Sequence, residues 1–550
     1  MPQPWLRPIL LAPLGVLLAL CVLLPAAGPA QAGEETGWST PLRISGPDPR
    51  AGGWFPAITT DVYGHVHVVW NGRAPRRPAA TTLESSQRTS DAAGWLIYAH
   101  SDGQKWSPPS EIAAIGEEGD ALRSSLTADT SGNLHLLYRG IDLKDPKVGG
   151  AENEPMRYAS VNALQAEWPA SWSAGAQFSR RTPAYFPEIT TDSRGTLHAL
   201  TTEADAKGKY TVYYRRSEDQ GKTWSLSTPI ETTLAVSRWR AQLKVGPNDD
   251  LNAVWEVVDP DEPSGRNPVG FVYARSTDGG QSWSTRVFAP PRKDYLYAKQ
   301  FEGTRWRLQP AVGVDGRGQI VLVWREYETD TIYFQRSTDG VEWTAPARMG
   351  GITKGLDRPF DRYDMALDSV GRLHLVLVAY PDGSPIMSLL HAEWLGYTWS
   401  TPKVITRAAS APFPEWPRIA IGEGNRLHVA WFGGSIPTVD RVPIGIWYST
   451  KRLDQAALPV APVPTRGPGS GVNATPATGS SQQSASAPPV PGQEAVTAPR
   501  PTGTPIARPS QPARNLDVTP LPVVQGLAVA ATVLVLFLLF RVRHQGGRGR

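Results

Sequence analysis

The sequence contains almost no cysteine. Its single cysteine, Cys21, lies in an apolar N-terminal run, so the rest of the 550-residue chain has neither a disulfide nor a thiol for chemistry. An exported domain without disulfides depends on a large hydrophobic core. Residues 33–453 are long enough to supply such a core.

The sequence also lacks a strong charge of either sign. It has 55 lysines and arginines against 51 aspartates and glutamates, and the four arginines of the last ten residues account for the whole excess of +4. Nucleic-acid binding requires a concentrated basic face. We therefore expect no nucleic-acid partner.

Long apolar runs are missing except at the two ends. Arg7 precedes apolar residues 9–24, and Ala30-Gln31-Ala32 then gives a small-residue cleavage pattern, so a signal peptide is predicted at 1–32. A signal-anchor retained in the membrane is the alternative. Prolines at positions 13, 25 and 29 interrupt the run and favour cleavage.

The second apolar run, residues 521–540, predicts one transmembrane helix, because about 20 residues at about 1.5 Å each span a hydrocarbon core of about 30 Å. The tail 541–550 carries four arginines and no acidic residue, so the positive-inside rule places it in the cytoplasm. Residues 454–520 are rich in Pro, Ser and Thr and predict a disordered stalk. We expect a single-pass cell-membrane protein whose main domain is extracellular.

Between residues 38 and 451 one pattern recurs seven times. Within residues 54–70 it reads aromatic-Pro-x-Ile-x-x-Asp-x-x-Gly-x-Val-His-Val-Val-Trp, and every copy alternates apolar residues on both sides of a turn. Such alternation predicts a β-hairpin in each copy. One column of the pattern contains His67, His135, His198, Asn252, Val321, His374 and His428.

A second hairpin follows each first one, and four of them carry variants of Ser-x-Asp-x-Gly-x-x-Trp. The aspartates of this motif are Asp102, Asp219, Asp278 and Asp339. The carboxylate can accept backbone N–H groups across the turn, glycine supplies a positive φ, and tryptophan packs on neighbouring strands. The motif resembles the Asp box, or BNR repeat, of the sialidase-like β-propeller superfamily. We expect these aspartates to be structural rather than catalytic.

Two hairpins per repeat make a four-stranded blade, and a ring of blades protects the sheet edges. The sequence therefore predicts an all-β fold, a seven-bladed β-propeller at 33–453, with six blades as the alternative. The last repeat lacks a fourth strand of its own. The strand at 38–44 is expected to complete that blade and close the ring.

In such a propeller the long loops lie opposite the Asp turns, and the residues that open the innermost strands surround the mouth of the central channel. The ligand-binding residues predicted there are Trp54, Arg123, Trp239, Trp306 and Trp416. Aromatic faces stack on sugars, and arginines bind carboxylates. The alternative is that the aromatic side chains only pack between blades.

The resemblance implies a catalytic site that this sequence does not match. Sialidases hold a substrate carboxylate with three arginines, one of them in a Phe/Tyr-Arg-Ile-Pro motif, and use a Tyr/Glu pair with an aspartate. The corresponding segment, Trp54-Phe55-Pro56-Ala57-Ile58, has the proline but no arginine. A different cluster is the candidate catalytic set: Arg240, Arg307 and Arg362 open three consecutive innermost strands, with Glu256, Glu326 and Tyr363 nearby.

No metal or other cofactor is predicted. The histidine column spreads its side chains around the ring, so these histidines are expected to be structural. The segment Asp259-Pro260-Asp261-Glu262 has ligand types suited to Ca²⁺, with a solvated acidic loop as the simpler interpretation.

Two functional classes follow. The first is a membrane-anchored propeller that binds an extracellular glycan or protein through its loop-rich face, and the missing arginine motif favours it. The second is a sialidase-type glycoside hydrolase with a non-standard arginine cluster, which the Asp boxes favour. The fold alone does not decide between them.

Overall fold

The computed structural model describes residues 37–46, 52–72, 93–117, 123–140, 155–179, 184–204, 209–231, 241–258, 268–288, 308–326, 329–355, 362–408, 412–434 and 443–456. The predicted signal peptide, transmembrane helix and cytoplasmic tail lie outside these residues, as does the stalk beyond its first three positions. Across the described segments, no helix has both the length and the apolar character needed to cross a bilayer.

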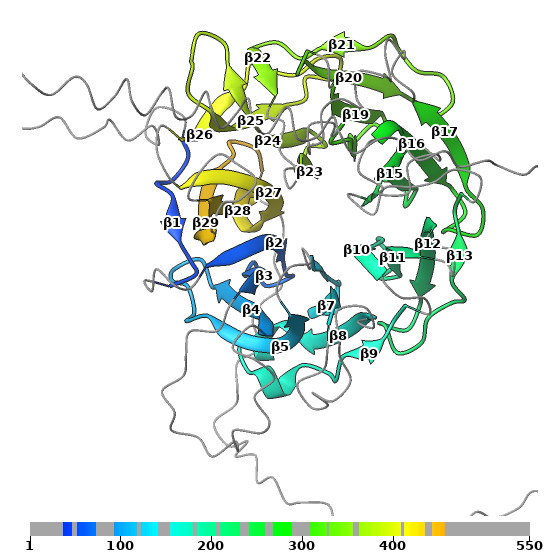
Figure 1. Cartoon of the computed structure of the whole chain (residues 1–550), viewed down its shortest axis with the longest axis vertical. Helices are drawn as coiled ribbons and strands as arrows, with labels where there is room; N and C mark the ends of the chain where they lie inside the picture. Colours follow the sequence, from blue (N-terminus) through cyan, green and yellow to red (C-terminus); the bar gives the residue numbers. More distant parts are fainter. Residues whose placement is uncertain are drawn as a thin grey trace, which may run out of the picture. The chain divides into compact units, whose positions relative to one another are not determined.

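The described residues form seven antiparallel sheets arranged as a ring, which confirms the predicted all-β, seven-bladed propeller (Figure 1). Blade 1 contains β2 (Gly53–Thr60), β3 (Val66–Gly72), β4 (Ala93–Ser101) and β5 (Ser110–Glu117). Blade 2 contains β6 (Ser125–Ala128), β7 (Asn133–Arg139), β8 (Met156–Asn162) and β9 (Ala176–Gln177). Blade 3 contains β10 (Ala184–Thr191), β11 (Leu197–Ala204), β12 (Tyr210–Ser217) and β13 (Thr228–Pro229).

The remaining blades follow the same order from the centre outwards. Blade 4 contains β14 (Gln242–Val245), β15 (Leu251–Val258), β16 (Pro268–Ser276) and β17 (Ser284–Phe288). Blade 5 contains β18 (Ala311–Val314), β19 (Ile320–Arg325), β20 (Ile332–Ser337) and β21 (Ala347–Arg348). Blade 6 contains β23 (Asp364–Leu367), β24 (Leu373–Pro381), β25 (Ser388–Glu393) and β26 (Lys403–Arg407), and β22 (Ile352–Gly355) also pairs with β24. Blade 7 contains β27 (Phe413–Gly422), β28 (Arg426–Gly434), β29 (Pro443–Arg452) and β1 (Leu42–Arg43).

The ring closes where the two ends of the propeller meet. Strand β1 pairs antiparallel with β29, with Leu42 opposite Tyr448 and Arg43 opposite Trp447. The backbone N–H of Ser39 donates to the carbonyl of Thr450 at 2.8 Å, which extends the pairing beyond the strand. The predicted closure of the last blade by residues 38–44 is therefore confirmed.

In five blades the turn of the innermost hairpin is held by one aspartate. In blade 1, Asp61 Oδ1 accepts the N–H groups of Tyr63 (2.9 Å) and His65 (2.8 Å), while Gly64 adopts φ 84°. The same two-bond pattern is made by Asp129, Asp192, Asp315 and Asp368. A short polar side chain beside a glycine thus fixes the hairpin register locally.

The Ser-x-Asp-x-Gly turns also link neighbouring blades. Asp278 Oδ1 accepts the N–H groups of Gln281 and Ser282, both at 2.9 Å. Hydrogen bonds to this carboxylate, those from Ser282 above all, lower the pKa of Asp278 to about 2. Gly280, at φ 84°, lies directly against the Tyr214 ring of blade 3. Tryptophans near these turns pack on the preceding blade: Trp106 on Tyr448, Trp224 on Tyr158, Trp283 on Tyr214 and Trp343 on Tyr273, with centroid separations of 4.8, 5.2, 5.3 and 5.1 Å.

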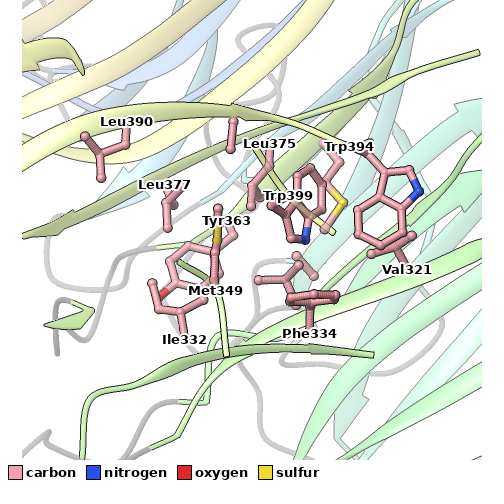
Figure 2. Close-up of a cluster of buried hydrophobic side chains, with 14 of the residues drawn as sticks. Val321, Ile332, Phe334, Met349, Tyr363, Leu375, Leu377, Leu390, Trp394 and Trp399 are labelled. Atoms are coloured by element: carbon pink, nitrogen blue, oxygen red, sulfur yellow. The ribbon is translucent and has the colours of Figure 1, made fainter. Parts of the chain in front are cut away.

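The hydrophobic core lies between the blades rather than at one centre. Figure 2 shows the cluster between blades 5 and 6, in which Phe334, Leu375, Trp394 and Trp399 pack together. Each large apolar side chain buried in this way contributes about 1.5–3 kcal/mol. A series of such clusters around the ring supplies the core that a chain without disulfides needs.

Candidate functional site

One column of the repeat converges near the axis of the ring. The residues at this position lie six places before the residue that aligns with Asp61 in each repeat. Those within the described segments are Phe55, Arg123, Phe186, Gln309, Arg362 and Trp416. Arg240 occupies the position in blade 4 and lies outside the described residues, as do Trp239, Trp306, Arg307 and the acidic segment 259–262.

Four members of this column share an unusual backbone conformation. Phe55, Phe186, Gln309 and Trp416 have φ values of 51°, 45°, 51° and 53°, and each precedes a proline. In blades 1, 3 and 7 the pairing of the innermost strands shifts at this point, which is the signature of a β-bulge. Positive φ at a bulky residue is costly and occurs most often at functional sites.

Three of these aromatic rings surround one arginine. The guanidinium carbon of Arg123 lies 4.2 Å from the ring centre of Phe55, 4.1 Å from that of Phe186 and 4.4 Å from that of Trp416. The three rings come from blades 1, 3 and 7, and Arg123 comes from blade 2. Because Arg123 is only 4% exposed, each cation–π contact is stronger than it would be at a solvent-exposed surface. Arg123 therefore joins four blades at the centre.

A network of ion pairs lies beside this cage and crosses the channel. Arg362 Nη1 of blade 6 donates to Glu188 Oε1 of blade 3 at 2.9 Å, and Arg418 Nη1 of blade 7 lies 3.6 Å from the same oxygen. Arg418 Nε donates to Asp364 Oδ2 at 2.9 Å, and Lys244 Nζ of blade 4 donates to Asp364 Oδ1 at 2.7 Å. These contacts tie blades 3, 4, 6 and 7 together.

The ion pair between Asp364 and Arg418 favours the charged form of both groups. Burial raises the pKa of Asp364, but the positive charges of Lys244 and Arg418 lower it by more. The resulting pKa of Asp364 is well below its usual value. Burial lowers the pKa of Arg418, and Asp364 reverses this effect and raises it overall. The pKa of Arg362 falls through burial and the nearby charge of Arg418, although a guanidinium still keeps its proton. Within this network three cations face two carboxylates.

Arg362 holds two hydrogen-bond donors that the described residues do not use. Its side chain is 97% buried, since its exposed fraction is 3%, and its guanidinium lies 5.1 Å from the Trp416 ring. Nε and Nη2 have no hydrogen-bond partner among the described residues. A buried donor without a partner costs about 1–3 kcal/mol, and more when it is charged. The arrangement is suited to an anionic oxygen that approaches Arg362.

The predicted ligand-binding residues that the structure describes are brought together. Arg123 and Trp416 are in direct contact, and Trp54 packs against Phe55 and Phe432 with centroid separations of 5.9 and 5.2 Å. Trp54 is half-buried, whereas Trp416 is only 2% exposed. The buried rings thus face Arg123 rather than forming an open platform for sugar stacking.

The predicted catalytic candidates have other partners. Glu256 is buried, and its Oε1 accepts the N–H groups of Leu308 (2.9 Å) and Gln309 (3.1 Å), which anchors the opening of β18 to blade 4. Glu326 Oε2 accepts the N–H and the hydroxyl of Thr329 at 2.9 and 2.7 Å. Tyr363 is fully buried in the cluster between blades 5 and 6, as Figure 2 shows.

Glu188, Asp364, Arg418 and Lys244 belong to the site and are missing from the sequence-based set. The first three occupy one repeat position, at which the other blades have Ala57, Ser125, Gln242 and Ala311. Charged side chains at a position where three blades have small residues were a signal that the sequence did contain. What it did not contain was the pairing, because Arg362 and Glu188 are 174 positions apart.

The histidine column lies at the other end of the innermost hairpins. Nδ1 of His67, His135, His198 and His428 lies 2.8, 2.7, 2.8 and 2.6 Å from the hydroxyls of Tyr98, Tyr158, Tyr214 and Tyr448, respectively. Each pair bridges the second and third strands of one blade. These contacts give the histidines a role in holding the blades together.

Comparison with known proteins gives only distant structural matches. No protein-family model matches the sequence, and no curated protein matches it. Among solved structures, a polysaccharide lyase of family PL25, an ulvan lyase, is 14% identical, with a TM-score of 0.45 over 72% of this chain and 94% of the lyase. The NanB sialidase of Streptococcus pneumoniae is 13% identical, with a TM-score of 0.40 over 76% of this chain and 71% of the sialidase. The intramolecular trans-sialidase of Ruminococcus gnavus is 10% identical, with a TM-score of 0.39 over 76% of this chain and 97% of that enzyme. These similarities concern the fold and say nothing of an activity of this chain.

Proposed function

We propose that this chain is a cell-surface binding protein that recognises an acidic group of an extracellular glycan at the mouth of its central channel. The observation that carries the proposal is the pair of unused donors of Arg362, buried beside a positive network. Guanidinium groups bind carboxylates and sulfates through two parallel hydrogen bonds. Nε and Nη2 are adjacent donors of the kind that such a bidentate contact requires.

A sugar acid suits this location better than a protein surface does. The donors lie near the axis of a ring whose centre is crossed by the contact between Glu188 and Arg362. A carboxylate on one sugar unit can approach such a point, whereas a folded protein presents a broad face. Trp54, half-buried beside the cage, offers an aromatic side chain to the rest of a sugar ring.

The contacts of the catalytic candidates favour binding over hydrolysis. Glycoside hydrolysis requires a carboxylate that can act as an acid, base or nucleophile. Glu256 and Glu326 instead accept backbone N–H groups, and Tyr363 lies in an apolar cluster. Hydrolysis remains the second candidate function, because Arg123 and Arg362 both contact the Trp416 ring and so bring two guanidinium groups to one place.

The proposed cellular context rests on the sequence. The signal peptide at 1–32, the stalk at 454–520 and the transmembrane helix at 521–540 would display the propeller outside the cell on a single-pass anchor. Protease treatment of intact cells tests this topology: the propeller should be released, and an epitope placed after residue 550 should be protected.

The binding proposal is tested with the purified full-length protein on an array of neutral, uronic-acid-containing, sulfated and sialylated glycans. Arg362→Gln should weaken binding to acidic glycans by about 10- to 100-fold, the equivalent of losing a charged hydrogen-bond pair. Arg372→Gln is the matched control, because Arg372 lies at the other end of the same blade and pairs with Glu393 at 2.9 Å. Equal binding of neutral and acidic glycans, or no effect of Arg362→Gln in a folded protein, would contradict the proposal.

A panel of fluorogenic glycosides, including a sialoside, separates the two candidate functions. We expect no turnover by the wild-type protein. Turnover that Arg362→Gln abolishes and Arg372→Gln leaves intact would replace the binding proposal with the hydrolase.

A further inference from the structure

Blade 1 contains a cluster of metal-ligating side chains that is far from the channel mouth. Asp61 directly follows β2, His65 directly precedes the return strand β3, and His67 is the second residue of β3. His65 Nδ1 lies 3.4 Å from Asp61 Oδ2, and His67 Nε2 lies 3.1 Å from the same oxygen. The three candidate ligand atoms all lie within 4.8 Å of one another. His65 is not a member of the histidine column, so the column does not explain it.

Two atoms of this cluster are buried without a hydrogen bond. The side chains of Asp61 and His67 have an exposed fraction of 0%. The contact between Asp61 Oδ2 and His67 Nε2 does not have hydrogen-bond geometry, and neither atom has another hydrogen-bond partner among the described residues. Buried polar atoms of this kind require an explanation such as an ion.

The other blades serve as internal comparisons for this position. In blade 2, Asn133 replaces the equivalent of His65 and donates its Nδ2 to Asp129 Oδ2 at 3.0 Å, while His135 Nε2 bonds the same oxygen at 3.0 Å. The carboxylate there is fully used by the protein. Among the described hairpins, only blade 1 places a second histidine at this position.

Blades 3 and 6 lack the third ligand in the same way. In blade 3 the equivalent residue is Thr196, and Arg194 pairs with Asp192 Oδ2 at 3.3 Å. In blade 6 the equivalent residue is Arg372, a cation that repels a metal ion. The single replacement of Asn, Thr or Arg by histidine therefore distinguishes blade 1.

Two of the three separations between the candidate ligand atoms match a tetrahedral metal site. Zinc binds histidine nitrogen and carboxylate oxygen at about 2.0–2.1 Å, so neighbouring ligand atoms of a tetrahedron lie about 3.3–3.4 Å apart. The measured separations of 3.1 and 3.4 Å from Asp61 Oδ2 are close to this edge length. An ion at this point would need little movement of the turn.

The ligands are already oriented by their outer contacts. Asp61 Oδ1 accepts two backbone N–H groups, which directs Oδ2 towards the histidines. His67 Nδ1 lies 2.8 Å from the hydroxyl of Tyr98, and an Nδ1–H that donates to this hydroxyl leaves the lone pair on Nε2. Metal-bound histidines ordinarily have such a partner on the second nitrogen.

We propose that Asp61, His65 and His67 bind one divalent transition-metal ion of the Zn²⁺ type, with water as the fourth ligand. The side chain of His65 is 18% exposed, so water and the ion reach the site from its side. The ion cross-links the β2–β3 turn. Thr60 Oγ1 of this hairpin donates to the carbonyl of Ile421 in blade 7 at 2.7 Å, so the ion stabilises the turn next to the blade that closes the ring.

The other candidate metal group in the described residues is weaker. His374, His391 and Glu393 lie together in blade 6. However, His374 Nδ1 is hydrogen-bonded to His391 Nε2 at 2.9 Å, and Glu393 Oε2 accepts from Arg372 at 2.9 Å. These ligand atoms are already used by the protein.

The test measures Zn²⁺ binding to the metal-stripped full-length protein by calorimetry. We expect a stoichiometry of one at this site and a loss of affinity of at least about 100-fold in His65→Asn, which copies the residue of blade 2. The control is Thr196→Asn, the same replacement at the equivalent position of blade 3, and it should bind like wild type.

A second measurement does not depend on the variants. Co²⁺ added to the wild-type protein should give the intense visible absorption of four-coordinate cobalt with nitrogen ligands. Equal Zn²⁺ affinity of a folded His65→Asn, or a weak six-coordinate cobalt spectrum in the wild-type protein, would overturn the proposed site.

Discussion

At the turn end of the innermost hairpins the same contacts recur in five blades, whereas at the opening end the side chain changes from one blade to the next. Asp61 and its four equivalents all accept two backbone N–H groups. At the opening end, by contrast, Phe55 is followed around the ring by Arg123 and Phe186. The side chains that repeat from blade to blade stabilise each blade. The side chains that vary contact one another near the axis of the ring.

The largest expected effect comes from breaking the network at the opening end. Asp364→Ala leaves the buried Arg418 and the partly buried Lys244 without their common partner, so we expect a loss of about 3–5 kcal/mol in the free energy of unfolding. Glu393→Ala removes the partly exposed ion pair with Arg372 and should cost about 0–1 kcal/mol. Urea unfolding measures both. Equal costs would mean that the buried network does not join the blades.

The fold was predictable from the sequence because each blade has its own local sequence pattern. The Asp-x-x-Gly turn, the alternation of apolar residues and the Ser-x-Asp-x-Gly motif all act within about 20 residues, a range over which sequence patterns are informative. Even the ring closure was predictable, since the last repeat lacked a strand that the first residues contained. The terminal segments rest on composition alone and stay predictions.

The site was only partly predictable, for the opposite reason. Arg123 and Trp416 were identified from their place at the start of innermost strands. Their cage depends on residues from four blades, and the partners of Arg362 and Asp364 are more than 50 positions away. No local pattern encodes such a meeting, because only the closed ring brings the strand openings together. Glu256 is a further example, because its hydrogen bond with Leu308 of the next blade could not be predicted from the residues next to it in the sequence.

Alanine substitutions at two glycines test the difference between a crowded turn and an open one. Gly280 adopts φ 84°, and a Cβ there would lie 2.1 Å from Tyr214 Cζ, so Gly280→Ala should cost about 3 kcal/mol through strain and overlap. Gly383 adopts φ 72° with no heavy atom within 4 Å of such a Cβ, so Gly383→Ala should cost about 1 kcal/mol. Thermal unfolding of both variants measures the difference. Similar shifts in Tm would show that the turn does not lock blade 4 to blade 3.

His428 of the histidine column makes stability depend on pH. Burial, assisted by the charge of Arg426, lowers the pKa of His428 to about 3, so the folded protein keeps this imidazole neutral while the unfolded chain binds a proton below about pH 6.5. Stability from His428 is therefore present above pH 6.5 and falls by about 1.4 kcal/mol per pH unit as the pH drops towards 3.

His428→Asn tests this pH dependence, because asparagine already occupies the equivalent position in another blade. Asn252 holds the equivalent position in blade 4 and accepts a hydrogen bond from Tyr273 at 2.6 Å. Between pH 7 and pH 5, the wild type should lose about 2 kcal/mol more than the variant. Urea unfolding at the two pH values gives both losses, and identical losses would contradict the buried neutral state of His428.

The smallest expected effect concerns the aromatic cage. Phe186→Leu keeps an apolar side chain of similar size in front of Arg123 but removes the ring that lies 4.1 Å from its guanidinium. We expect a cost of about 1–2 kcal/mol, since Phe55 and Trp416 still contact Arg123 and a single desolvated cation–π contact has this magnitude. If Phe186→Leu also weakens binding of acidic glycans and leaves Zn²⁺ affinity unchanged, the aromatic cage affects only the site at the opening end of the hairpins. A change in Zn²⁺ affinity would mean that the two ends of the hairpins are coupled through the blades, contrary to the division between repeated and varied side chains.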